Sequence, residues 1–291
     1  MRHVHSLKSN IFMIVGQVKG KTLLPLPAGS EKVECIDYEK EKIEELVDKS
    51  VIHAIESAVI DWSYQIQGAL KRESSEPLLQ GSNPNPKVEL EFWKSRYDNL
   101  ECIYNQLNAR KVRNMAELLD RVQSSYFPSF KAMFRDVAAA LSEAQDINLH
   151  LAPLQHHLEE IETVEFSEVK SLVSSLLHVV CLIWATSKYY NTPARIIVLL
   201  QEICNLLIQQ ARNYLNPEDI LKGETEESLG KVQEVLGILN HFKQTFEERR
   251  QNLYIYFKPD QEMKEWDFQS LLVFARLDSF LRRLEIVAVR I

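Results

Sequence analysis

The feature that most constrains this chain is a stripe of large apolar side chains that recurs every three or four residues from Ile43 to Leu70. This spacing is that of an α-helix, and it predicts a helix of about eight turns with one buried face. The same period returns over about residues 88–107, 166–190 and 266–284. The sequence therefore predicts a mainly α fold, arranged as an elongated antiparallel helical bundle.

Glycine and proline support this interpretation. The chain has only 8 glycines in 291 residues, and hairpins and phosphate loops depend on glycine. A heptad seam from Val232 to Leu253 is only about three heptads long, which favours bundle packing over a free coiled coil. At the end of the apolar run 166–190, Thr192 is expected to cap a new helix and Pro193 to take its first position.

Residues 1–36 have a different pattern. Asn10–Val15 is a short apolar run rich in β-branched residues, and Thr22–Pro27 is a second run that prolines stop. Two such runs joined by a polar turn are typical of two strands. We therefore predict a short β-rich N-terminal segment over 1–36, the remnant of a larger preceding unit, and a helical bundle over 37–291.

Charge and cysteine content exclude several classes of protein. The formal net charge is −7, from 34 Lys plus Arg and 41 Asp plus Glu, whereas proteins that bind nucleic acid usually carry the opposite balance. Four dispersed cysteines form no disulfide framework or zinc site and suit a reducing compartment. The run Ser171–Ser187 is uncharged but short and interrupted by polar residues, so we expect a buried bundle helix and no membrane span. The first apolar run is too short for a signal peptide.

One segment superficially resembles a phosphate-binding loop. Gly16–Thr22 follows an apolar run and ends in Gly-Lys-Thr. The functional motif needs four residues between its glycines, but only three lie between Gly16 and Gly20, and the segment leads into prolines. Nucleotide binding through Lys21 is therefore disfavoured but stays open to titration with ATP or GTP.

Histidines and cysteines give no convincing site. His150, His156 and His157 lack the spacing of metal ligands. His178 and Cys181 are one helical turn apart, yet they lie in the most apolar helix, where a desolvated thiol is inert. From the residues we predict no catalytic residue, no cofactor-binding residue, no metal ligand and no cofactor.

Several strings of residues resemble the N-terminal tail of dynein heavy chains, specifically the axonemal outer-arm β type. They are Val59–Ile66, Glu91–Arg96, Ile183–Ile197, Leu199–Asn205 and Gly16–Pro27, and they occur in the order of the family. The resemblance covers nearly the whole chain. A complete heavy chain is many times longer, so the resemblance implies a fragment or short isoform without the AAA+ motor, in which residues 1–36 are the remnant of a preceding tail domain.

The resemblance implies a function as well. In the family, the tail is a rod of helical bundles that joins heavy chains, holds intermediate and light chains and anchors the complex in the ciliary axoneme. It therefore implies a non-enzymatic scaffold of the cytoplasm and cytoskeleton. The expected partners are dynein intermediate chains, light chains and other heavy chains, with no nucleic acid, membrane or small-molecule substrate. The alternative is a free-standing helical adaptor unrelated to motor assembly.

Six residues of the family-like string are expected to form a structural corner between two buried helices. The corner combines a cap, a proline start and aromatic packing. We expect these residues to be architectural and not to contact a partner: Trp184, Tyr189, Tyr190, Asn191, Pro193 and Arg195.

Overall fold

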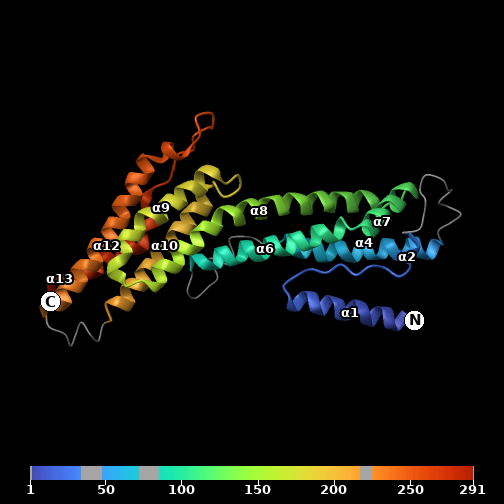
Figure 1. Cartoon of the computed structure of the whole chain (residues 1–291), viewed down its shortest axis with the longest axis horizontal. Coiled ribbons are helices and arrows are strands. Elements are labelled where there is room, and N and C mark those ends of the chain that lie inside the picture. The colour runs from blue at the N-terminus through green and yellow to red at the C-terminus, as the bar shows by residue number, and fades with distance from the viewer. Residues whose placement is uncertain (1, 34–47, 72–84, 217–224, 291) are drawn as a thin grey trace. The chain divides into compact units, whose positions relative to one another are not determined.

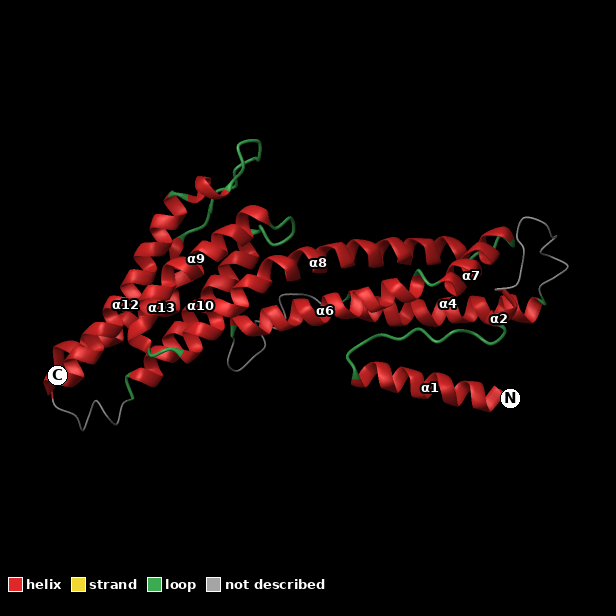
Figure 2. Ribbon diagram, in the orientation of Figure 1, coloured by secondary structure: helices red, strands yellow, loops and turns green. Residues whose placement is uncertain are grey.

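The computed structural model describes residues 2–33, 48–71, 85–216 and 225–290. Over these residues the regular structure is helical, with no β-strand (Figures 1 and 2). The prediction of a mainly α fold is confirmed. The elements are α1 (Arg2–Val18), α2 (Ser30–Val33), α4 (Lys49–Leu70), α6 (Pro86–Leu107), α7 (Arg110–Arg121), α8 (Phe127–Thr163), η1 (Phe166–Glu168), α9 (Val169–Thr186), α10 (Pro193–Tyr214), α12 (Thr225–Gln251), η2 (Leu253–Tyr256) and α13 (Ser270–Arg290).

The chain divides into two compact units, each made of two stretches of sequence. The first unit comprises residues 1–73 and 94–145, and the second comprises 74–93 and 146–291. Helices α6 and α8 therefore contribute residues to both units. The predicted boundary between residues 36 and 37 lies outside the described residues and stays a prediction.

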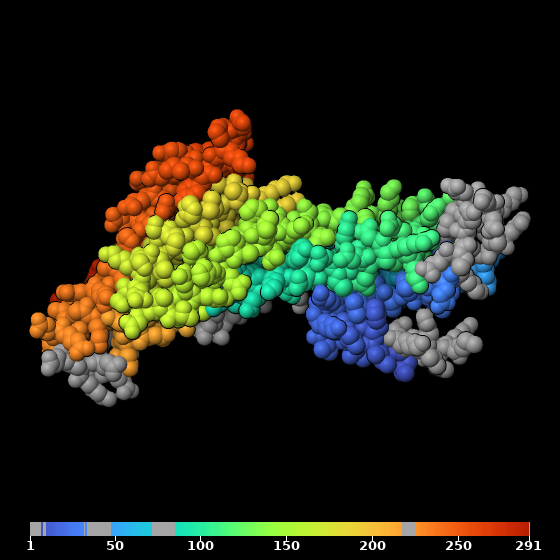
Figure 3. Space-filling view, viewed as in Figure 1, coloured from blue at the N-terminus to red at the C-terminus, as the bar shows by residue number. Residues whose placement is uncertain are grey.

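The predicted β-rich N-terminal segment is wrong. Residues Arg2–Val18 form the helix α1, which lies on the outside of the first unit (blue in Figure 3). The β-branched run is compatible with this helix because its apolar residues also recur at helical spacing, at Leu7, Ile11, Ile14 and Val18. Strand propensity is strongly dependent on context, and no neighbouring strand is available among the described residues to pair with this segment.

The segment after α1 runs along α6 without forming a strand. The backbone amides of alternate residues, Thr22 and Leu24, donate to side chains. In a β-strand they would donate to the backbone of a neighbouring strand. Thr22 N donates to Asn99 Oδ1 at 2.6 Å, and Leu24 N donates to Gln106 Oε1 at 2.8 Å. Gln106 Nε2 also donates to the carbonyl of Thr22 at 2.9 Å. Two amide side chains of a helix thus satisfy the backbone that the sequence suggested would pair with another strand.

The core of the first unit follows the predicted apolar stripe. The helix α4 buries five residues of that stripe, and the part of the stripe before Asp48 lies outside the described residues. Trp62 is the largest of them: its Nε1 donates to the carbonyl of Pro25 at 3.0 Å, and its ring lies 6.4 Å from that of Phe130. The buried residues of α4 are Val51, Ile55, Val59, Trp62 and Ile66.

The second unit is built on α9, α10, α12 and α13. Contacts join α10 to α13, and α12 to both α9 and α13. Stacked and edge-on aromatic rings join α12 to α13 and to the segment before α13: the ring of Phe246 lies 5.2 Å from that of Trp266 and 5.0 Å from that of Phe274. The boundaries differ from the prediction in two places: the helix expected over 166–190 ends at Thr186, and the last helix begins at Ser270 and continues to Arg290.

We expect Gln106→Leu to release the segment after α1. The substitution removes both hydrogen bonds of the side chain to the segment and leaves the buried amide of Leu24 without its acceptor. Loss of buried partners costs about 1–3 kcal/mol of unfolding free energy. Native-state hydrogen exchange should accelerate at the Leu24 amide. Asn105→Leu, at the exposed neighbouring position, is the control, and unchanged exchange at Leu24 would contradict the assignment.

Candidate functional site

The predicted corner is a tight turn that connects α9 to α10 in the second unit. Asp146, on α8, holds this turn with a single oxygen, Oδ2. That oxygen accepts hydrogen bonds from the hydroxyl of Ser187 at 2.6 Å, from Lys188 N at 3.0 Å and from Tyr189 N at 3.2 Å. The Ser187 hydroxyl in turn accepts from Tyr190 N at 3.0 Å. Side chains therefore satisfy the amides of Lys188, Tyr189 and Tyr190 in this turn.

Tyr190 points from this turn to a buried carboxyl group. Its hydroxyl donates to Glu89 Oε1 at 3.2 Å, and Trp93 Nε1 donates to the same oxygen at 2.7 Å. Glu89 is only 2% exposed and Tyr190 is fully buried. The other carboxyl oxygen of Glu89, Oε2, is buried without a hydrogen-bond partner.

Burial dominates the electrostatics of this carboxyl group. Removal from water raises the pKa of Glu89, against the hydrogen bonds of Trp93 and Tyr190 and the charge of Arg195, which lower it. Burial, followed by the neighbouring charge of Glu89, also raises the pKa of Tyr190 well above its ordinary value. The phenol therefore stays protonated and acts as a donor, not as a nucleophile.

Arg195 closes the corner from the first turn of α10. Its Nη1 donates to the carbonyl of Tyr189 at 2.6 Å. The guanidinium lies 5.2 Å from the centre of the Trp93 ring and 6.0 Å from that of Tyr190, which is within the range of cation–π attraction. Arg195 thus binds the turn, lies over the rings of Trp93 and Tyr190, and lowers the pKa of Glu89 through its charge.

The remaining corner residues occupy the ends of the two helices. Trp184, on α9, is 2% exposed, and its Nε1 donates to the carbonyl of Lys264 at 2.7 Å. Thr192 is the N-cap of α10 and Pro193 lies in its first turn, as the pattern predicts, but the Thr192 side chain makes no capping hydrogen bond. Asn191 is half-buried in the turn.

Sequence reasoning missed two residues of this site, Glu89 and Asp146. A signal existed for Glu89, which precedes the inward-facing Trp93 by one helical turn and therefore lies on the buried face of its helix. No local signal pointed to Asp146, since it meets the turn across 41 residues of sequence. Chemically, the arrangement can orient helices, but it presents no nucleophile beside a base.

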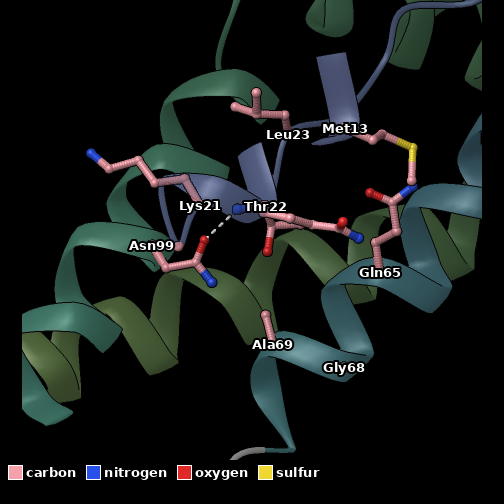
Figure 4. Close-up of a pocket in the computed structure, with 10 residues that line it drawn as sticks. Met13, Lys21, Thr22, Leu23, Gln65, Gly68, Ala69 and Asn99 are labelled. Carbon is pink, nitrogen blue, oxygen red and sulfur yellow. Dashed lines mark hydrogen bonds between the residues drawn. The ribbon is translucent and has the colours of Figure 1, made fainter. Parts of the chain in front are cut away.

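The phosphate-loop-like segment is committed to other hydrogen bonds. It lines a pocket of about 360 Å³ at the end of α1 (Figure 4). The amides that would cradle a phosphate all donate within the protein: Lys19 N to Gly16 O, Gly20 N to Gln17 O, Lys21 N to Gly16 O and Thr22 N to Asn99 Oδ1. A phosphate cradle requires several free N–H groups that converge. In this loop those N–H groups already donate hydrogen bonds within the protein.

The histidines and cysteines considered as metal ligands or catalytic groups make separate contacts within the fold. His150 Nδ1 lies 2.7 Å from the carbonyl of Asp146, and His178 Nδ1 lies 3.1 Å from the Tyr256 hydroxyl. Burial raises the pKa of Cys181 to about 12, so this thiol is not a reactive thiolate. Within the described residues, no group of three potential metal ligands comes together.

One apolar helix could be long enough to cross a membrane. Among the described residues this is Phe166–Thr186, and half of its most apolar window is buried inside the fold. The core helix of a bundle satisfies the same criteria of length and composition. The buried side chains of α9 contact the other helices of the second unit.

Comparison with known proteins identifies the family. A family model described as "Dynein heavy chain, N-terminal region 1" matches residues 52–288. The chain belongs to this family. The resemblance to the N-terminal tails of dynein heavy chains is thereby confirmed, and residues before 52 lie outside the matched region.

Individual relatives agree over nearly the whole chain. It is 66% identical over 286 residues to human "Dynein axonemal heavy chain 9", which covers 98% of this chain. It is 54% identical to "Dynein beta chain, ciliary" of Heliocidaris crassispina and 38% identical to "Dynein beta chain, flagellar outer arm" of Chlamydomonas reinhardtii, over 99% and 97% of this chain. The chain spans about 6% of the length of these relatives.

We expect the stability of the second unit to depend on the protonation of Glu89. The pKa of this carboxyl group is raised from 4.5 in the folded state. The folded chain therefore keeps the proton over a range of pH in which the unfolded chain has released it. The contribution of Glu89 to the unfolding free energy is complete below the pKa of the unfolded state. It is lost as the pH rises through the pKa of the folded state.

The measurement is urea unfolding of the wild type and Glu89→Gln from about pH 4 to about pH 8, the range in which a raised carboxyl pKa has its effect. The wild type should lose stability relative to Glu89→Gln as the pH rises. Glu91→Gln, at an exposed position on the same helix, should run parallel to the wild type. Parallel profiles for all three proteins would contradict the role given to burial.

We expect Trp184→Ala to destabilise the second unit strongly. The change opens a cavity in the core and removes the donor to the Lys264 carbonyl, which together cost about 3–5 kcal/mol. For a chain of this size, the melting temperature should fall by roughly 10 °C. Leu182→Ala, on the exposed side of the same helix, is the matched control. A melting temperature equal to that of the wild type would refute the buried, architectural role.

Proposed function

We propose that this chain is a non-catalytic tail segment of a ciliary dynein heavy chain. It serves as a scaffold that brings heavy chains together and holds intermediate and light chains for microtubule-based movement. The observation that carries the proposal is the match of residues 52–288 to N-terminal region 1 of dynein heavy chains. The names of the relatives, which include axonemal, ciliary and flagellar outer-arm chains, support the axoneme of a cilium as its location.

The packing of the second unit supports a mechanical role. A scaffold under load must keep its helices in register, which close packing of large side chains achieves. Here Arg250 joins α12 to the start of α13: it donates to the carbonyls of Trp266 at 3.0 Å and Phe268 at 2.7 Å and to the Ser270 hydroxyl at 2.9 Å. The connection between these helices is thereby tied back to the bundle.

The corner supports the same interpretation. Its buried side-chain polar atoms, apart from Glu89 Oε2, have hydrogen-bond partners that hold the turn and orient α9 and α10. A catalytic site would instead bring a nucleophile and a base together in a cleft that a substrate can enter. We therefore interpret the six predicted corner residues as architecture, with partner contacts made elsewhere on the surface.

Co-purification tests the proposal. The tagged 291-residue chain, incubated with an extract of ciliary axonemes, should retain a dynein intermediate chain or another dynein heavy chain. The aligned 286 residues of the human relative are the positive control, and Trp184→Ala, which opens the core, should retain less. Mass spectrometry of the bound proteins is the readout.

A second readout is the location of the chain in ciliated cells. A fluorescent fusion should concentrate in the axoneme. If neither a dynein subunit is retained nor the fusion enters cilia, while the chain is folded by circular dichroism, the scaffolding role is wrong. An unrelated helical adaptor would then be the better interpretation.

A further inference from the structure

The helix α1 presents a row of large aliphatic side chains to solvent. Leu7, Ile11, Ile14 and Val18 follow one another at helical spacing, and Val15 lies beside them. Soluble proteins rarely leave such a continuous apolar row uncovered. We call these five residues the α1 face. Their exposed fractions are Leu7 63%, Ile11 54%, Ile14 57%, Val15 42% and Val18 83%.

The contacts that hold α1 in the first unit lie on its other side. Gly16 is opposite the α1 face on the helix and is buried. A Cβ at this position would lie 2.6 Å from the carbonyl oxygen of Lys21 and 2.8 Å from Leu23 Cγ, so only glycine permits this approach. Met13 also faces the unit, where its sulfur accepts from Gln65 Nε2 at 3.8 Å. The α1 face is thus not used to attach the helix.

An apolar groove lies next to α1. It has a volume of about 400 Å³ and is formed between Phe12 of α1, the extended segment and the start of α7. Phe12 is itself 44% exposed. A groove of this kind can receive the side chains of a docking helix. Its apolar lining consists of Phe12, Leu24, Pro25, Leu26, Ala109 and Val112.

The charged residues of the extended segment and of the first turn of α7 are basic. Residues 2–28 contain four basic residues and no Asp or Glu, although the whole chain is acidic, with a net charge of −7. The first turn of α7, at the edge of the groove, adds three more. A partner with acidic residues beside its apolar stripe would match this surface. The basic residues at this surface whose side chains are described are Lys19, Lys21, Arg110, Lys111 and Arg113.

We propose that the α1 face and the adjoining groove dock an amphipathic α-helix of a partner protein, one whose apolar stripe is flanked by Asp and Glu. The face spans twelve residues, from Leu7 to Val18, or about three helical turns, which suits the side-by-side packing of two helices. The inference concerns a surface of the first unit and stands independently of the proposed scaffolding role.

Two other occupants fit less well. A second copy that met α1 face to face would bring together two segments whose charged residues are all basic, so their charges would repel. A membrane surface would cover the α1 face but is too flat to fill a groove of about 400 Å³. A helix with protruding side chains covers both.

The test uses three fluorescent peptides of equal length and the 291-residue chain. The first peptide is an amphipathic helix with a leucine stripe flanked by Glu, the second has Lys in place of Glu, and the third keeps Glu but has Ser in place of leucine. Fluorescence anisotropy should show binding of the first peptide only. Binding should weaken with added salt, as expected for charge complementarity.

The variant Ile11→Gln with Ile14→Gln should weaken binding of the first peptide by at least roughly tenfold. The reason is that the complex loses two isoleucine side chains that the peptide would bury. Both positions are exposed, so folding should be retained. Leu149→Gln, which alters a leucine that is 67% exposed on α8, is the matched control and should bind as the wild type does. Lys19→Glu with Lys21→Glu should also weaken binding.

Three kinds of result would overturn the proposal. One is equal binding of the Glu and Lys peptides, or binding that Ile11→Gln with Ile14→Gln leaves unchanged. Another is a dimer in analytical ultracentrifugation that this double variant abolishes, which would assign the α1 face to a second copy. The third is co-sedimentation with phosphatidylserine-containing vesicles, lost in the variant, without peptide binding.

Discussion

The buried corner of the second unit depends on the hydrogen bonds of one carboxylate oxygen, Asp146 Oδ2. The backbone amides of a turn between two helices lie outside both helical hydrogen-bond patterns, so they need other acceptors. Asp146 accepts from two of them and from Ser187, whose hydroxyl accepts from Tyr190 N. This chain of bonds directs the Tyr190 ring inward, so the contact with Glu89 follows from it.

Glu89 introduces a cost that apolar packing would avoid. A buried carboxyl group is weak evidence for stability, because an apolar residue of similar size is often as good. What Glu89 adds is direction: one oxygen aligns the indole of Trp93 with the phenol of Tyr190. Arg195 stacks on the same two rings and binds the turn. The polar groups of the corner therefore select one packing of α9 and α10.

The parts of the structure that were predictable are those encoded by local periodicity. The buried face of α4, the burial of Trp184 and the proline start of α10 follow from spacing and capping rules. The structure of residues 2–18 could not be predicted in this way, because their β-branched run favours a strand whereas their helical spacing favours a helix. In the segment that follows, Asn99 and Gln106, more than 75 residues away, bind the backbone that a second strand would have used. Asp146 was missed for the same reason, since its partners are distant in sequence.

The two units differ in how much apolar surface they leave in contact with water at these two places. In the corner, Trp184, Tyr190 and Glu89 are already buried and hydrogen-bonded within the unit, so a partner gains nothing by covering them. In α1, the aliphatic face still contacts water, and each Å² removed from water would contribute about 25 cal/mol. A helix of 17 residues is marginal by itself in water. A ligand that binds only the helical form stabilises that form by mass action, so docking on α1 and the helicity of α1 are thermodynamically linked.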